Sequence, residues 1–283
     1  MATAGDILAR FNEIKTLPHV AIKLSQLISD ENSSLNQFEE LIRMDPGLVI
    51  RLLRTVNSPY YGLMNKVDSI SRAVMFIGLK GLRNMVVTEA LRDIFRLGPD
   101  EEIFSRNRLW LHSAAVAICS QMIAERIFGL KGEDAYLCGI LHDIGLIVAD
   151  QTVHAKLIEV FSAYAPARSL TEIENEIVGT NHTVIGAQLA KQWNLPETVQ
   201  EGIRQHHRYR EFIKPGSPAG LVQCADYIVS QMSYAMVPNY RALLAPEIAD
   251  HIKLNLQEYK ALTRDLPDEM ARARELYEGA AHD

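Results

Sequence analysis

Five of the nine histidines and two aspartates stand in segments whose other residues are mostly apolar. In chain order they are His112, His142 with Asp143, His182, His206 with His207, and Asp226. A charge taken out of water costs several kcal/mol, so each of these groups needs a hydrogen bond, an ion pair or a metal ion. A single buried histidine is more often a hydrogen-bonded core residue, but one shared metal centre would account for all of these residues together.

The residue types favour a transition metal. Neutral imidazole and carboxylate together suit Fe, Mn, Zn, Co or Ni, whereas sites built for magnesium or calcium contain few histidines. An aspartate that directly follows a histidine, as Asp143 follows His142, can bridge two ions. Two ions about 3.5 to 4 Å apart would hold a hydroxide for in-line attack on phosphorus. The pattern predicts one or two divalent ions, with Asp143 as the catalytic carboxylate if the site is active.

Helices are the elements that must position these side chains. Apolar residues recur at three- and four-residue spacing along most of the chain, and period-two alternation is almost absent. Within residues 107–129, His112 shares one stripe with Val116, Cys119 and Ile123, so it faces the interior. Short breaks rich in Gly, Pro, Asn and Asp divide the chain into about a dozen helices. We therefore predict an all-α fold.

The segment RLGPDEE, residues 96–102, is the predicted domain boundary, because an apolar helix ends there in Gly-Pro and acidic residues follow. This boundary divides the chain into residues 1–100 and 101–283, and every candidate metal ligand lies in the second part. The charge-rich end, from Leu266 onward, predicts a solvated helix with a frayed tail.

Composition limits the remaining function classes. The net charge of −6 and the pI near 5.9 give no basic footprint for non-specific nucleic-acid binding. Cys119, Cys138 and Cys224 lie far apart without a CxxC pair, which is typical of buried thiols in a reducing compartment. The first residues do not form a signal peptide, and no apolar run approaches the roughly 18 residues that span a bilayer. We expect a soluble cytoplasmic protein without a membrane partner.

Several motifs, in order, resemble the HD-related output domain (HDOD) family of the HD-domain metal-dependent phosphohydrolase superfamily. In the first half they are TLPHVAIKLSQLI, LIRMDPGLVIRLLRTVNSPYYG and VDSISRAVMFIGLKGLRNMVV. In the second half they are LCGILHDIG, NHTVIGAQLAKQWNLPETV and IRQHH. The resemblance covers roughly residues 14 to 230. It implies a multi-helix N-terminal bundle, residues 1–100, packed on an HD-like helical core, residues 101–283.

The resemblance also implies site residues and a role. The metal-binding positions of the HD pattern correspond to His112, His142, Asp143, His182, His206 or His207, and Asp226. HDOD proteins are mostly bacterial signalling or regulatory modules, which implies a signalling protein or a nucleotide, such as a cyclic dinucleotide, as partner. One departure concerns catalysis: active HD-GYP phosphodiesterases read His-Asp-x-Gly-Lys, and Leu146 stands here in place of the lysine. Leucine cannot neutralise phosphate charge or transfer a proton.

Two hypotheses follow. In the first, the chain is a bacterial HDOD regulatory protein whose metal site is structural or sensory. In the second, it is a metal-dependent phosphohydrolase that cleaves a phosphodiester or a nucleotide with a metal-bound hydroxide, and Arg204 and Arg208 contact phosphate.

A third interpretation, a DNA-binding helix-turn-helix in ISRAVMFIGLKGLRNMV with the basic residues Lys80 and Arg83 near its turn, is disfavoured. Apolar Met75, Phe76 and Ile77 stand where a recognition surface needs polar groups. Nucleic acid is therefore not an expected partner.

Overall fold

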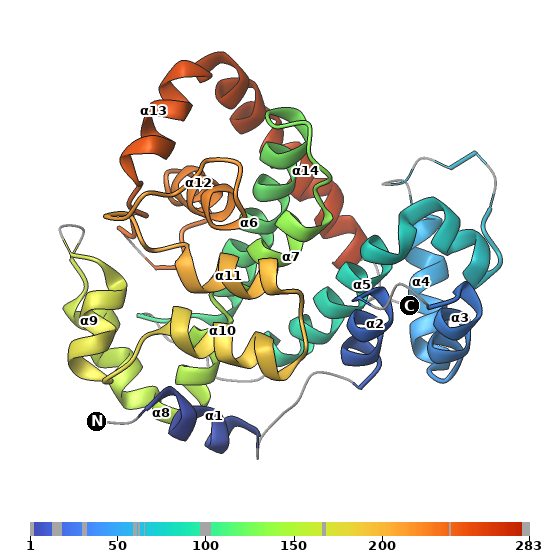
Figure 1. Cartoon of the computed structure of the whole chain (residues 1–283), viewed down its shortest axis with the longest axis horizontal. Coiled ribbons are helices and arrows are strands. Elements are labelled where there is room, and N and C mark those ends of the chain that lie inside the picture. Colours follow the sequence, from blue (N-terminus) through green and yellow to red (C-terminus); the bar gives the residue numbers. More distant parts are fainter. Residues whose placement is uncertain are drawn as a thin grey trace.

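The computed structural model describes residues 3–12, 19–29, 33–58, 61, 63–64, 66–96, 103–165, 168–237 and 239–278. Within these ranges the chain forms helices α1 to α14 and no strand, which confirms the all-α prediction (Figure 1). No helix in these ranges is both long enough and apolar enough to cross a membrane. Cys119, Cys138 and Cys224 are buried and free, as expected.

Four helices gather at one end of the molecule (Figure 1). They are α2 (His19–Ser29), α3 (Leu35–Arg43), α4 (Pro46–Val56) and α5 (Ile70–Arg96). The Asp-Pro turn of the sequence begins α4, where the Asp45 side chain accepts a hydrogen bond from the backbone amide of Leu48. Gly78 has a φ of 71° and interrupts α5, a conformation that a residue with a Cβ rarely adopts.

The remaining helices build the larger body around α6, which packs against α7, α12 and α14. They are α6 (Arg106–Arg126), α7 (Glu133–Leu141), α8 (Ile144–Ala163), α9 (Leu170–Ile177), α10 (His182–Gln192), α11 (Glu197–Gln205), α12 (Pro218–Ser230), α13 (Pro246–Leu254) and α14 (Leu256–Glu278). Gly145, the glycine of HDIG, lies directly against α10, where a Cβ would collide with the backbone oxygen of His182. This glycine therefore allows the start of α8 to approach the start of α10.

Helix α1 (Ala4–Asn12) packs against α8 and α10, far from α2 in the view of Figure 1. Its buried residues are Ala4, Ile7, Leu8 and Phe11. The N-terminal helix therefore packs on the larger body. Of the predicted boundary segment, residues 97–102 lie outside the described residues, and the division at residue 100 stays a prediction.

An ion-pair cluster joins α5 to the start of α7. The Asp134 carboxylate accepts a hydrogen bond from Lys80 Nζ at 2.6 Å and another from Arg83 Nη2 at 2.8 Å. The Asn84 side chain donates to the backbone oxygen of Glu133. Arg83 is completely buried, so this basic residue of the disfavoured helix-turn-helix is a structural contact of the interior.

The prediction of a solvated helix at the C-terminal end is wrong for one face of α14. Leu262, Leu266 and Met270 are buried, and α14 packs along α6. The charged residues of this segment occupy the opposite face, as in an ordinary amphipathic helix.

Candidate metal centre

The seven predicted ligand residues converge at the centre of the larger body. His112 lies in the middle of α6, His142 and Asp143 form the turn between α7 and α8, His182 begins α10, His206 and His207 directly follow α11, and Asp226 lies in α12. All are buried except His207, which is half-buried. Residues more than a hundred positions apart therefore share one interior site, as the pattern predicts.

Asp143 occupies the middle of this site. Its Oδ2 atom lies 3.1 Å from His142 Nε2 and 3.7 Å from His112 Nε2. Its Oδ1 atom lies 3.3 Å from His182 Nε2 and 3.7 Å from His206 Nε2. The two oxygens thus face two different pairs of imidazoles, which is the arrangement of a bridging carboxylate.

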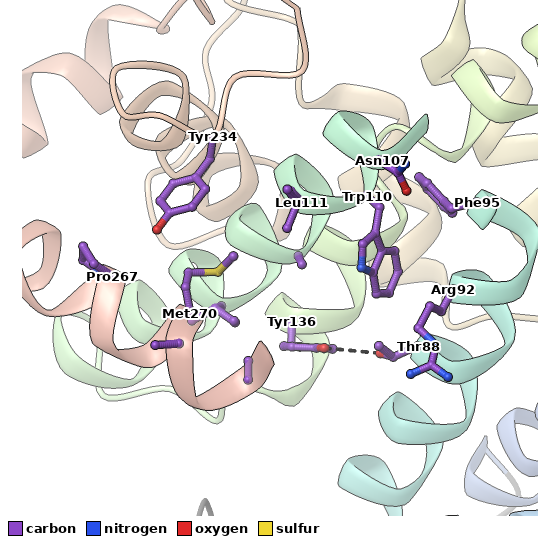
Figure 2. Close-up of a pocket in the computed structure, with 14 residues that line it drawn as sticks. Thr88, Arg92, Phe95, Asn107, Trp110, Leu111, Tyr136, Tyr234, Pro267 and Met270 are labelled. Atoms are coloured by element: carbon purple, nitrogen blue, oxygen red, sulfur yellow. Dashed lines mark hydrogen bonds between the residues drawn. The ribbon is translucent and has the colours of Figure 1, made fainter. Parts of the chain in front are cut away.

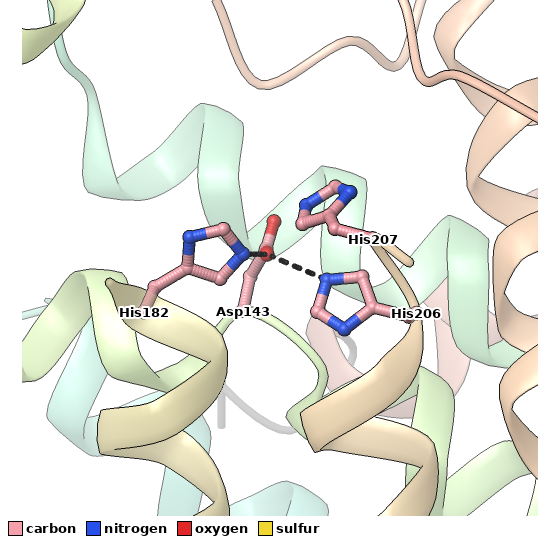
Figure 3. Close-up of side chains that lie close together, drawn as sticks. All are labelled: Asp143, His182, His206 and His207. Atoms are coloured by element: carbon pink, nitrogen blue, oxygen red, sulfur yellow. Dashed lines mark ion pairs between the residues drawn. The ribbon is translucent and has the colours of Figure 1, made fainter. Parts of the chain in front are cut away.

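Two groups of ligand atoms result, each with all its members within 4.8 Å of one another. The first contains Asp143, His182, His206 and His207 (Figure 3). The second contains His112, His142 and Asp143, and Asp226 Oδ1 lies 3.3 Å from the Nε2 atom of His112. The sequence left open whether His206 or His207 belongs to the site, and the structure brings both to the first group.

Hydrogen bonds on the far side of the rings fix the tautomers of four histidines. In each case Nδ1 donates to an oxygen: His112 to the Tyr234 carbonyl at 2.9 Å, His142 to the Gly139 carbonyl at 2.7 Å, His206 to the Ile203 carbonyl at 2.7 Å, and His182 to Glu174 Oε2 at 2.6 Å. A proton on Nδ1 leaves the lone pair on Nε2, which points into the site. Metal-binding histidines are held by this kind of hydrogen bond.

The atoms that face the centre have no hydrogen bond of normal geometry. They are Nε2 of all five histidines, both carboxylate oxygens of Asp143 and Oδ1 of Asp226. A buried polar atom without a partner costs about 1–3 kcal/mol. Divalent cations would satisfy all of these atoms together, so the residues fit a metal centre.

The electrostatics of the site also favour a cation. Burial alone would lower the pKa of His142, but the adjacent Asp143 carboxylate raises it to about 9, so that without metal its Nε2 atom holds a proton that a metal ion would replace. Burial would raise the pKa of Asp143, but His142 and the neighbouring imidazoles hold it well below the ordinary value. Burial lowers the pKa values of His206 and His207, which keeps these two rings neutral and able to act as ligands.

Three supporting residues were not predicted from the sequence. Glu174 binds His182, and the Tyr234 carbonyl binds His112. The buried Tyr240 donates its hydroxyl to Asp226 Oδ2 at 2.9 Å, and its ring meets the His112 ring edge-on. Only Glu174 carried a sequence signal, because it is an acid directly after Ile173 on the apolar face of a short helix.

Access to the site is narrow. A cavity of about 10 Å³ borders His207 and Tyr240, with Tyr164, Arg168 and Arg241 around its mouth. This volume holds about one water molecule. Leu146, at the position of the lysine in HD-GYP enzymes, is completely buried.

The two arginines predicted to contact phosphate lie on the surface. Arg204 is exposed, and Arg208 forms an ion pair with Glu211 at 3.0 Å. Their predicted role in phosphate binding stays a prediction.

Comparison with known proteins places this architecture in a family. A family model described as HDOD domain matches residues 14–209. The chain belongs to the HDOD family. An uncharacterized protein of Treponema pallidum (strain Nichols) is 30% identical over 213 residues, which cover 72% of this chain and 39% of that protein. This HDOD chain therefore spans about two fifths of that relative.

Solved structures share the HDOD fold. A structure from Marinobacter aquaeolei VT8, described as a "Putative signal transduction protein", aligns with a TM-score of 0.72 at 22% identity, over 95% of this chain and 61% of that one. A structure from Shewanella amazonensis SB2B, described as a "Putative phosphohydrolase", aligns with a TM-score of 0.66 at 24% identity, over 96% and 95% of the two chains. At these identities the similarity establishes the fold.

Proposed function

We propose that this HDOD protein is a bacterial regulatory module that binds divalent metal in its HD-type centre and acts by contacting a signalling protein or a nucleotide. The observation that carries the proposal is the enclosure of the centre. Its ligands are buried except for the half-buried His207, and the adjoining cavity of about 10 Å³ admits a water molecule but no nucleotide. A complete ligand set without room for a substrate fits a structural or sensory metal.

The ligands divide between two ions. Asp143 Oδ1 with His182, His206 and His207 would hold one ion. Asp143 Oδ2 with His112, His142 and Asp226 would hold the other. The mixture of imidazole and carboxylate favours Fe, Mn, Zn, Ni or Co. Such ions, when bound, lower the pKa of water and polarise phosphoryl oxygens.

The surrounding residues hold the ligands in place and exclude solvent. Glu174 orients His182, and backbone carbonyls orient the other rings. Tyr240 holds Asp226 and covers the centre next to His112. Leu146 places an apolar side chain where HD-GYP phosphodiesterases have a cation. These contacts support a rigid, dry site.

The alternative function is metal-dependent hydrolysis of a phosphodiester or a nucleotide, with Asp143 as the bridging carboxylate. The observation in its favour is that exposed Arg168 and Arg241 line the cavity together with His207. Arg168 also pairs with Glu176, and Arg241 donates to the Ser230 carbonyl. A phosphate beside this cavity would still meet two cationic groups. Tyr240 would have to leave Asp226 before a substrate reached the ligands.

Metal content and turnover, measured on one preparation, separate the two functions. The protein is purified without chelator or nickel affinity, and its metal is measured by elemental mass spectrometry beside the His142→Ala, Asp143→Ala variant. We expect about one or two equivalents of transition metal in the wild type and none in the variant. The matched control is His154→Ala, because His154 lies outside the centre and binds Asp150.

The metal-loaded protein is then assayed with cyclic dinucleotides, nucleotides and an aryl phosphate. We expect no turnover. Metal-dependent turnover that the double variant loses would establish the alternative instead. Absence of metal from the wild type would overturn both functions.

A further inference from the structure

A second cavity lies between α5, α6 and α14 (Figure 2). Its volume is about 240 Å³. Aromatic side chains form much of its wall: Phe95, Trp110, Tyr136 and Tyr234. Leu111 of α6 and Met270 of α14 add aliphatic contacts. Flat apolar surfaces on several sides suit a planar ring.

One end of this cavity is polar. Arg92 lies there with its side chain only 14% exposed, and its Nη2 atom is 3.6 Å from Glu89 Oε2. The Nε atom of Arg92 is buried and has no hydrogen-bond partner among the described residues, so this guanidinium keeps one donor in addition to its contact with Glu89. Thr88 lines the same end, and its hydroxyl lies 3.2 Å from that of Tyr136. A cation and hydroxyls beside aromatic walls suit a ring that carries an acidic group.

The volume limits the size of the occupant. A closed apolar cavity of about 150 Å³ binds benzene, so the cavity beside Trp110 has room for one or two fused rings with a small substituent. We propose that this cavity binds a small planar aromatic anion, with the ring between Trp110 and Met270 and the acidic group on Arg92. Mostly apolar walls with a few convergent polar groups are typical of ligand sites.

Two residues connect the cavity to the metal centre. Leu111 lines the cavity and directly precedes His112 in α6. The ring of Tyr234 lines it as well, while the Tyr234 carbonyl accepts the Nδ1 hydrogen bond of His112. A bound ring that displaced Tyr234 would move the group that orients this ligand. We infer that the aromatic anion modulates the metal centre, a link that rests on the proposed function.

Binding is tested with two probes of the same shape, 2-naphthoate and the neutral 2-naphthamide, by isothermal titration calorimetry on the full chain. We expect the wild type to bind the carboxylate about tenfold more tightly than the amide. Arg92→Met should lose this preference. The matched control Arg264→Met removes an arginine from the exposed face of α14 and should keep it.

The blocking variant is Ala271→Trp, because Ala271 lies on the exposed rim of the cavity, where a larger side chain does not disturb the core. We expect it to lose both probes. Equal binding of the two probes by the wild type, or undiminished binding by Ala271→Trp, would overturn the site.

The link to the centre is tested on protein loaded with Co²⁺, whose visible spectrum reports the geometry of its ligands. We expect 2-naphthoate to change this spectrum in the wild type and not in Ala271→Trp. An unchanged spectrum at saturating probe would overturn the link. Probe binding without metal binding would refute the proposed function and leave the cavity site intact. Metal binding without probe binding would refute the cavity site alone.

Discussion

Two aspartates stand at the two ends of α7, and they differ in what balances the charge of the carboxylate. Asp134, in the first turn, is about one-third exposed and pairs with two cations of the protein, Lys80 and Arg83. Asp143, just after the last turn, is completely buried, and both its oxygens face imidazole nitrogens without forming a hydrogen bond of normal geometry. The first carboxylate is satisfied by the chain itself, whereas the second is arranged for a cation from outside.

The two ends of α7 also have different roles, one in packing and one in the candidate metal centre. The Asp134 end joins α7 to α5, and the Asp143 end carries the middle of the candidate metal centre. A change at the first end should therefore alter the free energy of unfolding, and a change at the second should alter metal binding. Variants at each end of α7 test this difference.

The largest effect is expected from Asp143→Asn. With free metal at about a thousand times the dissociation constant, the wild type should gain about 4 kcal/mol of unfolding free energy over metal-free protein. The variant should gain almost none, because the amide cannot bridge two cations. Urea unfolding with metal and with chelator measures this increment. Asp134→Asn is the matched control and should keep it; an increment in Asp143→Asn equal to that of the wild type would refute the role of Asp143.

The next largest effect is expected from Arg83→Met. Arg83 is completely buried, and its loss leaves Asp134 with Lys80 alone. Breaking a buried pair costs about 3–5 kcal/mol, and the partial exposure of Asp134 reduces this to about 2–3 kcal/mol. Urea unfolding measures the loss, and metal stoichiometry should not change. A loss below about 0.5 kcal/mol, like that of an ordinary surface substitution, would contradict the structural role of Arg83.

A smaller effect concerns pH. Burial would raise the pKa of Asp134, but the hydrogen bonds and charges of Lys80 and Arg83 hold it below the ordinary value. A carboxyl whose pKa is lowered by folding stabilises the protein above its unfolded pKa of about 3.9 and loses this contribution as pH falls toward the folded pKa. The difference in unfolding free energy between wild type and Asp134→Asn should therefore stay constant above about pH 5 and shrink below about pH 4. A difference that did not shrink at all between pH 5 and pH 3 would contradict this account.

The smallest effect is expected from Lys80→Met. The Lys80 side chain is 43% exposed, so solvent screens its ion pair with Asp134. The cost in unfolding free energy should be about 0.5 kcal/mol or less, and it should decrease further in high salt. A cost as large as that of Arg83→Met would show that the two cations contribute equally, against the difference in their burial.

Much of the architecture was predictable because helices repeat locally. The three- and four-residue spacing of apolar residues predicted an all-α chain and placed His112 on the inner face of its helix. The same pattern was misleading at the C-terminal end, because the many charges of α14 concealed the buried stripe of Leu262, Leu266 and Met270. Periodicity identifies a face, but packing decides whether another helix covers it.

The candidate metal centre was likewise predictable only in part from the sequence. The residue types alone indicated that the histidines and aspartates embedded in apolar segments needed partners, because unpaired burial of polar groups is costly, and that one shared metal centre would supply them. Only the tertiary structure decided that both His206 and His207 reach the first group of ligands and that each oxygen of Asp143 faces a different group. The contact of Tyr240 with Asp226 had no local pattern, and the pattern around Glu174 indicated a buried acid without identifying His182 as its partner. Contacts between distant helices depend on how the helices pack, and the spacing of residues along one helix does not contain that information.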